Sequence, residues 1–365
     1  NADVLLSRAV RSGDAPSVAS PFLVRLMSVL RAANMEGEIE NKTPLLGIHT
    51  ALHTPAAVTP IEVPYVTPPA ALRPKELSVT AIETLMHDPY AVYARYILHL
   101  RQKSPLDAAP NASERGVFTH AALDTFMKKY PDTLPENAEQ ELLTIGHETF
   151  KGRMNSPSVR AFWWPRFERT AKWFVAFERE RRGLSKTLGT EVHGKLEIDM
   201  GDSIFTLTCI ADRIDRGADD KLEMIDLKTG TVPSQKSVTL GFSPQLTLEA
   251  LIGFTGGFKG IDAASVGKLQ YWKLSGGRPA GDLTDVKGNV EKLVAEARQG
   301  LENVVRTFND AATPYLVTPR PAFAMRYNNT RHLSRVDEWS TVQKVAPAVK
   351  TAPRRLPTAR TGGKR

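Results

Sequence analysis

Two short acidic segments decide the fold of this chain: residues 225–230, which read IDLKTG, and residues 211–215, which read ADRID. Each lies on an apolar run of the kind that forms a β-strand. Alternate side chains of a strand point to the same face, so Asp226 and Lys228 should project together. A hairpin between the two runs would bring Asp212 beside them.

Carboxylates that converge on one point repel each other unless a cation lies between them. Their hard oxygen atoms favour Mg²⁺, with Mn²⁺ as the alternative. A lysine beside such an ion can orient water or stabilise developing negative charge. Asp212, Asp226 and Lys228 therefore suit the metal-assisted hydrolysis of a phosphodiester.

The composition indicates an ordinary globular protein. Of its residues, 41% are hydrophobic and 24% are charged. The length of 365 residues is enough for two or more domains. No run of about 18 apolar residues occurs, so we expect no membrane contact through a spanning helix. Cys209 is the single cysteine, which excludes an internal disulfide and fits a cytoplasmic protein. No P-loop sequence occurs, so we expect no ATP site of that type.

The net charge of +8 resides in the C-terminal tail. Residues 341–365 carry seven basic residues and no acidic one, and without them the net charge is +1. Such a composition predicts a basic, disordered tail, and such a tail could touch phosphates.

The N-terminal part is expected to be helical and then extended. Residues 1–50 carry apolar residues at helical spacing, first at Val4, Leu5 and Ala9, and then in a second helix that Ser20-Pro21 would open. Residues 51–76 contain six prolines, which predicts an extended linker. We therefore expect a domain boundary near residue 76 and a second domain over residues 77–340.

The second domain begins with a helical pattern. Thr80 is a candidate N-cap, with Glu83 as its capping-box partner. Further helices are predicted from Pro89, from about Ser113, and over residues 159–182. The last of these is rich in Trp and Phe, which we interpret as core residues rather than a platform for stacking bases.

The pattern then changes to strands. Residues 191–199, 203–214 and 221–228 alternate apolar and polar side chains, which predicts an antiparallel meander. Cys209 falls on the apolar face of this meander and should be buried. A helix over about 243–254, a strand over 268–274 and a helix over 285–309 should follow.

Four segments in order resemble the RecB-like branch of the PD-(D/E)xK nuclease superfamily. They are a G-x-x-x-H-x-x-L helix at 116–123, the two acidic strands, and a Q-L pair at 245–246. Within that branch the chain is most similar to the C-terminal part of the AddB family of helicase–nuclease subunits, which residues 327–339 also resemble.

The resemblance implies a restriction-endonuclease-like α/β fold: a mixed sheet flanked by helices, here preceded by the helical segment and the linker. It implies Mg²⁺ held by His120, Asp212 and Asp226, together with the carbonyl of Leu227. Lys228 would position or activate the attacking water, and Gln245 would contact the site or the DNA backbone. The implied substrates are single-stranded DNA and duplex ends, and the implied partner is an AddA-like helicase–nuclease subunit in double-strand break repair.

One departure from the family concerns iron. Many AddB proteins hold an iron–sulfur cluster through four cysteines, the first in a Cys-Pro-aromatic motif. The matching residues 87–90 read HDPY, and one cysteine cannot build such a cluster. We therefore expect no cluster, and instead closure of the domain by apolar contacts near His87 and Tyr90.

Two alternatives remain at the level of sequence. The chain could be a catalytically silent nuclease fold that braces a helicase partner and guides DNA, although the presence of Asp212, Asp226, Lys228 and His120 argues against it. Among the other acids, Glu191 and Glu197 are most simply interpreted as surface residues of a strand. Asp215 is more simply a turn residue or a partner of Arg213 than a ligand of a second metal.

Overall fold

The structure, a computed structural model, describes residues 6, 8–12, 15–39, 45–54, 56–57, 61–103, 106, 108–201, 203–325 and 328–340. Its contacts divide the chain into two compact units, residues 1–60 and 61–365. The basic tail expected over 341–365 lies outside the described residues.

The first unit contains short elements. Strands β1 (Arg11–Ser12) and β2 (Ala15–Pro16) pair with each other, and helices α1 (Pro21–Ala32), η1 (Glu36–Ile39) and α2 (Leu45–His53) follow. As predicted, α1 has Ser20 at its N-cap and Pro21 in its first turn. Val4 and Leu5 lie outside the described residues, and Ala9 belongs to no helix. Helix α2 extends into the expected linker.

The second half of that expected linker is part of the second unit. The buried Arg73 guanidinium donates hydrogen bonds to the carbonyls of Pro68, Phe308, Ala311 and Thr313, at 2.7–3.1 Å. The Tyr315 N–H donates to the carbonyl of Val66 at 2.7 Å. The division between the units therefore falls at residues 60–61 and not near 76, because Arg73 and these backbone contacts fix the proline-rich segment.

A mixed sheet forms the centre of the second unit, as the resemblance implied, and it has six strands. Its order is β3-β5-β6-β7-β8, and β4 pairs with β5. The expected meander is confirmed, because β4, β5 and β6 pair antiparallel; β3 and β5 are parallel, as are β6 and β7, and β8 returns antiparallel. The bounds are β3 (Glu76–Ser78), β4 (Ser185–Asp199), β5 (Ile204–Gly217), β6 (Leu222–Lys228), β7 (Val266–Lys273) and β8 (Asp282–Asp285).

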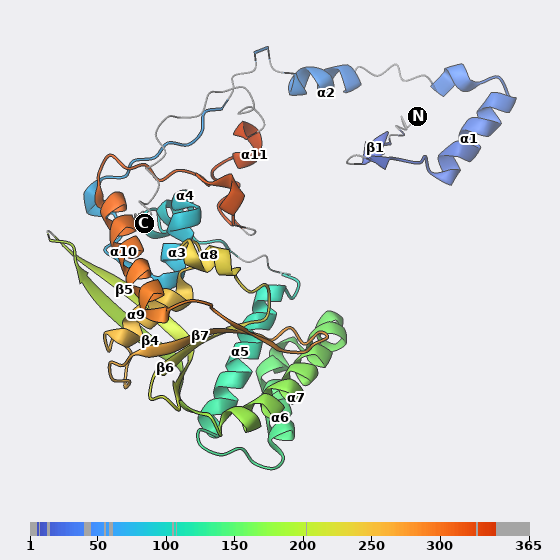
Figure 1. The fold of residues 1–365 in the computed structure, drawn as a ribbon. Coiled ribbons are helices and arrows are strands. Elements are labelled where there is room, and N and C mark those ends of the chain that lie inside the picture. Colours follow the sequence, from blue (N-terminus) through green and yellow to red (C-terminus); the bar gives the residue numbers. More distant parts are fainter. Residues whose placement is uncertain are drawn as a thin grey trace, which may run out of the picture. The chain divides into compact units, whose positions relative to one another are not determined.

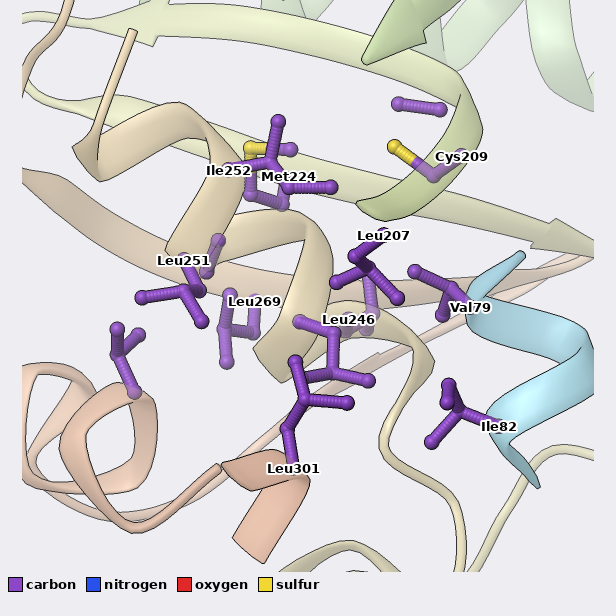
Figure 2. Close-up of a cluster of buried hydrophobic side chains, with 14 of the residues drawn as sticks. Val79, Ile82, Leu207, Cys209, Met224, Leu246, Leu251, Ile252, Leu269 and Leu301 are labelled. Carbon is purple, nitrogen blue, oxygen red and sulfur yellow. The ribbon is translucent and has the colours of Figure 1, made fainter. Parts of the chain in front are cut away.

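Helices cover both faces of this sheet (Figure 1). One core joins strand residues to α3 (Val79–His87), α9 (Gln245–Phe254) and α10 (Val290–Asn309), and Figure 2 shows part of it, including Cys209, which is buried as predicted. The other core joins the sheet to α5 (Ala112–Lys129), α6 (Ala138–Phe150) and α7 (Trp164–Arg181), and contains Trp163, Phe167 and Phe174 of the aromatic stretch. The smaller elements are η2 (Ala70–Leu72), α4 (Pro89–Val92), η3 (Tyr93–Ile97), η4 (Lys151–Arg153), η5 (Val159–Trp163), α8 (Gln235–Thr239), η6 (Pro321–Phe323) and α11 (Val336–Trp339).

Three predicted helix starts require correction or refinement. Helix α3 begins at Val79, because the Ser78 hydroxyl accepts from the Ala81 N–H at 3.1 Å, and the N-cap is therefore not Thr80. The aromatic stretch starts with a π-helical turn, η5, before the proline at the start of α7. Helix α10 starts at Val290, because residues 282–285 pair with β7 as β8.

The surroundings of His87 combine aromatic packing with hydrogen bonds. Phe242 and Phe323 stack with their ring centroids 3.9 Å apart, and Tyr90 packs against Tyr93. The imidazole nitrogens of His87 lie 2.5 Å from the Phe323 carbonyl and 2.8 Å from the Phe242 carbonyl. The apolar contacts expected here are present, and His87 ties together segments far apart in the chain.

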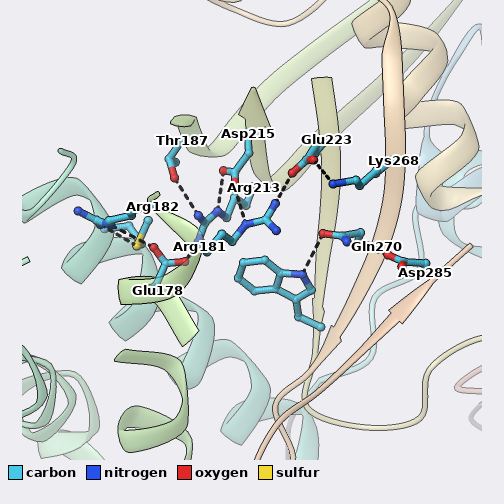
Figure 3. A network of polar contacts seen from close by, with 12 residues as sticks. Glu178, Arg181, Arg182, Thr187, Arg213, Asp215, Glu223, Lys268, Gln270 and Asp285 are labelled. Atoms are coloured by element: carbon cyan, nitrogen blue, oxygen red, sulfur yellow. Dashed lines mark hydrogen bonds and ion pairs between the residues drawn. The ribbon is translucent and has the colours of Figure 1, made fainter. Parts of the chain in front are cut away.

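A buried ionic network joins α7 to the sheet (Figure 3). Arg213 bonds Asp215 and Glu178, and Arg181 bonds Asp215 and Glu223. Both guanidinium groups also lie over the ring of Trp272, at 4.7 and 4.9 Å from its centroid. Because two arginines occupy both oxygens of Asp215, this residue is a partner of Arg213, as predicted.

The loop after α9 packs closely against β4, and a glycine substitution can test this contact. Gly257 accepts a hydrogen bond from the Lys195 N–H of β4 at 2.9 Å, and a Cβ at residue 257 would lie 2.1 Å from the Lys195 carbonyl oxygen. Gly257→Ala should therefore separate the loop from β4 and lower the free energy of unfolding by about 1–3 kcal/mol. Urea unfolding followed by circular dichroism would measure this loss.

Gly300→Ala is the matched control. Gly300 lies within α10, and a Cβ there meets no atom within 4 Å. The substitution should raise the free energy of unfolding by roughly 0.5–1 kcal/mol, because alanine favours a helix over glycine. Equal effects of the two substitutions would contradict the close approach at Gly257.

Candidate active site

The pairing of β5 with β6 brings the two aspartates to one place. The paired residues run from Arg216 with Leu222 to Arg213 with Ile225, so Asp212 and Asp226 stand next on the same ladder. The Leu227 N–H donates to Asp212 Oδ2 at 2.7 Å. Asp212 therefore lies against the backbone of the strand that carries Asp226.

Helix α5 supplies His120 to the same place. A capping box between Asn111 and Glu114 fixes the start of this helix. A Cβ at Gly116 would lie 3.0 Å from the hydroxyl of Thr229, so glycine allows α5 to approach the end of β6 closely. One turn later, His120 Nδ1 lies 3.6 Å from Asp212 Oδ1.

Glu191 of β4 joins this pair, contrary to its interpretation as a surface residue. It lies across from Asp212, because Thr190 pairs with Arg213 and Val192 with Ala211. Ligand atoms of His120, Glu191 and Asp212 all lie within 4.8 Å of one another. The backbone of Glu191 has φ = 49°, a conformation that is uncommon for a non-glycine residue and often marks a functional site.

Glu197, the other acid considered on β4, fits the surface interpretation. Its carboxylate is exposed and lies 2.6 Å from Lys195 Nζ. The two glutamates of one strand therefore have different surroundings, which their spacing alone did not reveal.

A second set of contacts continues from Asp226 to α9. Lys228 Nζ donates to Asp226 Oδ1 at 2.8 Å and to Gln245 Oε1 at 3.0 Å. Gln245 Nε2 donates in turn to Glu249 Oε1 at 3.2 Å. Lys228 thus contacts both of the other predicted residues, Asp226 and Gln245, and Glu249, which the sequence analysis did not single out, extends this series of hydrogen bonds. Its signal was a glutamate within an otherwise apolar helical stretch, four residues after Gln245.

The electrostatics of the site follow from burial and from crowding of acids. Burial raises the pKa of Asp226 to about 7, against the lowering effect of Lys228. Burial alone would lower the pKa of His120, but its hydrogen bond to Asp212 and the nearby charges of Asp212, Asp226 and Glu191 raise it. Burial and the charge of Asp212 raise the pKa of Glu191. An excess of negative charge therefore surrounds His120.

These donors fit a divalent cation. A cavity of about 10 Å³, room for one small ion or water, is lined in part by His120, Glu191 and Asp212. The buried Oδ2 of Asp226 has no hydrogen-bond partner among the described residues. Carboxylate oxygens with one imidazole suit Mg²⁺ or Mn²⁺. Of the three expected ligands, the structure groups His120 and Asp212 with Glu191, and Asp226 lies on the adjoining strand.

The chain belongs to the PD-(D/E)XK nuclease superfamily, whose family model matches residues 76–323. This match covers the sheet, the helices on both its faces and all the residues of the site described above. Members of this superfamily are usually phosphodiesterases, and they typically use a divalent metal ion.

Longer bacterial proteins share part of this sequence. A protein of Rickettsia bellii is 34% identical over 185 residues, 51% of this chain and 22% of that protein. A protein of Rickettsia felis is 33% identical over 189 residues, with the same coverage, and both are described only as uncharacterized. The matched part thus spans about a fifth of these relatives. The crystal structure of SSO0001 covers 63% of this chain and 76% of its own at 16% identity and a TM-score of 0.25, and we draw nothing from it.

No helix in the described part of the chain is long and apolar enough to cross a membrane.

Metal binding provides a test of the place of Glu191 in the site. Glu191→Gln should weaken the binding of Mn²⁺ by about tenfold or more, because it removes a charged donor from the group around His120. Electron paramagnetic resonance of free Mn²⁺ would measure the affinity. The exposed Glu197→Gln on the same strand is the control, and an equal affinity of both variants would remove Glu191 from the site.

The dependence of folding stability on pH provides a second test of the site, because the free energy of unfolding depends on the protonation of Asp226. Its raised pKa means that the folded, metal-free protein holds this proton more tightly than the unfolded chain. The resulting stabilisation is complete below about pH 4 and is lost as the pH rises through about 7. Asp226→Asn should therefore gain roughly 2–4 kcal/mol over the wild type between pH 4 and 8.

Urea unfolding in the presence of a chelator would measure this difference. Asp262→Asn, a change at an exposed position, is the control, and its free energy of unfolding should vary between pH 4 and pH 8 as that of the wild type does. A difference between Asp226→Asn and wild type that stays constant with pH would contradict the burial of an ionisable carboxyl group.

Proposed function

We propose that residues 61–340 form a metal-dependent deoxyribonuclease that cuts single strands and the ends of duplex DNA. The observation that carries the proposal is the contact of Lys228 with Asp226 at the end of β6, beside Asp212, His120 and Glu191. Membership of the PD-(D/E)XK superfamily supports phosphodiester hydrolysis as the reaction. Mg²⁺ is the proposed ion and Mn²⁺ a substitute.

His120, Glu191, Asp212 and Asp226 would hold the cation, which when bound supplies Lewis-acid charge to a phosphate. Lys228 is fixed by two acceptors, Asp226 and Gln245, so its ammonium has one remaining N–H. That N–H can orient the attacking water or stabilise charge on the phosphate oxygens. Asp212 is held by the Leu227 N–H and by His120, which keeps its carboxylate in place.

We further propose that the chain acts as the AddB-like part of a complex with an AddA-like helicase–nuclease subunit, in cytoplasmic repair of double-strand breaks. The ordered segments at 116–123, 211–215, 225–230 and 245–246 support this assignment. The domain does so without an iron–sulfur cluster: His87 stands where that family has its first cluster cysteine, and its imidazole and the Phe242–Phe323 stack tie the C-terminal segment to the core.

Lys228→Ala and Asp226→Ala provide the test of this function. Asp226→Ala should reduce cleavage of labelled single-stranded DNA in Mg²⁺ to background, because it removes both a cation donor and the anchor of Lys228. Lys228→Ala should lower kcat by about 100-fold or more while Mn²⁺ affinity is retained, since an ammonium group is not a ligand.

Lys221→Ala, an exposed change just before β6 and at the other end of that strand from Lys228, should cut at the wild-type rate. Wild-type protein that binds DNA but degrades neither single strands nor duplex ends with Mg²⁺ or Mn²⁺ would instead favour the silent scaffold that guides DNA for a partner.

A further inference from the structure

Glu249 occupies a position where the structure gives no packing reason for a carboxyl group. It is 2% exposed, and every residue of α9 from Leu246 to Gly253 is buried. Oε1 accepts from Gln245, but Oε2 is buried without a hydrogen-bond partner among the described residues. A buried polar atom without a partner costs stability, so a leucine here would suit the apolar core better.

The contacts of Glu249 lead directly to Lys228. Gln245 and Glu249 stand four residues apart on α9, so their side chains share one face of the helix. The Gln245 amide joins the two neighbours: its oxygen faces the Lys228 ammonium at 3.0 Å and its nitrogen faces Glu249 at 3.2 Å. The amide is the only link between Glu249 and Lys228 that these hydrogen bonds define.

The orientation of that amide matters for Lys228. An amide turned by 180° would place its NH₂ group against the ammonium, donor against donor, and Lys228 would lose one of its two acceptors. A carboxyl oxygen of Glu249 can accept from the NH₂ group whether Glu249 is ionised or protonated, so it favours the observed orientation in both states. Lys228 alone gives the amide one fixed contact, and Glu249 gives it the second.

We propose that Glu249 is a positioning residue for the nuclease reaction: it fixes the orientation of the Gln245 amide and thereby directs the free N–H of Lys228 toward the reacting phosphate. This inference rests on the proposed function. The hydrogen bonds of Glu249 reach Lys228 only through Gln245, so its effect should fall on turnover. The buried, partly unpaired carboxyl group of Glu249 would then lower the stability of the fold while it raises the turnover of the enzyme.

Three variants of the whole chain test this role. Glu249→Gln keeps an oxygen acceptor of the same shape, whereas Glu249→Leu removes it and retains the volume. Thr247→Val is the matched control, because Thr247 is a buried polar residue of the same helix whose hydroxyl donates to the Pro244 carbonyl at 3.0 Å. Glu249→Met supplies a second apolar replacement if the leucine variant does not fold.

Steady-state cleavage of a labelled single-stranded oligonucleotide in Mg²⁺ gives the first readout. Glu249→Leu should lower kcat by about 10- to 100-fold with little change in KM, and its melting temperature should equal or exceed that of the wild type. Glu249→Gln should restore most of the turnover, and Thr247→Val should retain all of it. A merely structural role would lower the melting temperature and leave kcat unchanged.

Wild-type turnover in Glu249→Leu, or turnover in Glu249→Gln as low as in Glu249→Leu, would overturn the inference while leaving the nuclease function in place. A wild-type protein without cleavage would refute the proposed function instead. In that case hydrogen exchange of the Lys228 ammonium, followed through its ¹⁵N signal, still tests the positioning role of Glu249. Slow exchange in the wild type and in Glu249→Gln, together with fast exchange in Glu249→Leu, would support this role. Equal exchange rates in all three proteins would overturn it.

Discussion

The register of three antiparallel strands is the constraint on which the site depends. The pairing of β4 with β5 and of β5 with β6 sets Glu191, Asp212 and Asp226 on neighbouring strands along one line across the sheet. A shift of one residue in either pairing would turn one of these carboxylates to the opposite face. Three acids this close repel each other, so the strands must be held in register by contacts elsewhere.

Those contacts lie on the opposite side of the same strands. Arg213 follows Asp212 directly and bonds Glu178 of α7 and Asp215, while Arg181 of α7 bonds Asp215 and Glu223 (Figure 3). Trp272 of β7 fills the space beside both guanidinium groups. The network therefore links α7 to β5, β6 and β7 next to the acidic line. Breaking one partner of such a buried set leaves an uncompensated charge, which opposes any slip of the strands.

The sequence predicted those parts of the fold that depend on local pattern. Alternation identified the meander, and the spacing around Gln245 identified α9. Glu191 was assigned to the surface because a half-buried strand shows the same alternation whether its polar face meets water or a helix, and only the pairing with Asp212 and the approach of α5 distinguish the two. Residues 61–76 resembled a linker because prolines exclude regular structure. The prolines say nothing about Arg73, and three of its four hydrogen bonds go to residues more than 230 positions away in the sequence. Helix α6 and strands β3 and β8 were not predicted, and the two strands are only three and four residues long.

The attachment of residues 61–76 has a practical consequence for dissecting the chain. A fragment that begins at residue 77, where the recognisable nuclease pattern starts, would lack Arg73 and also Glu76, the first residue of β3. The pairing of β3 with β5 would lose its first residue pair, Glu76 with Thr206, and the carbonyls of Phe308, Ala311 and Thr313 would lose their common donor. The two remaining residues of β3 would stand at the chain end, where strands fray, and a β5 edge exposed in this way is a template for pairing with other chains, so such a fragment would tend to aggregate. A fragment that begins at residue 61 keeps Arg73, the whole of β3 and their partners, and the proline-rich stretch serves as its N-terminal clamp.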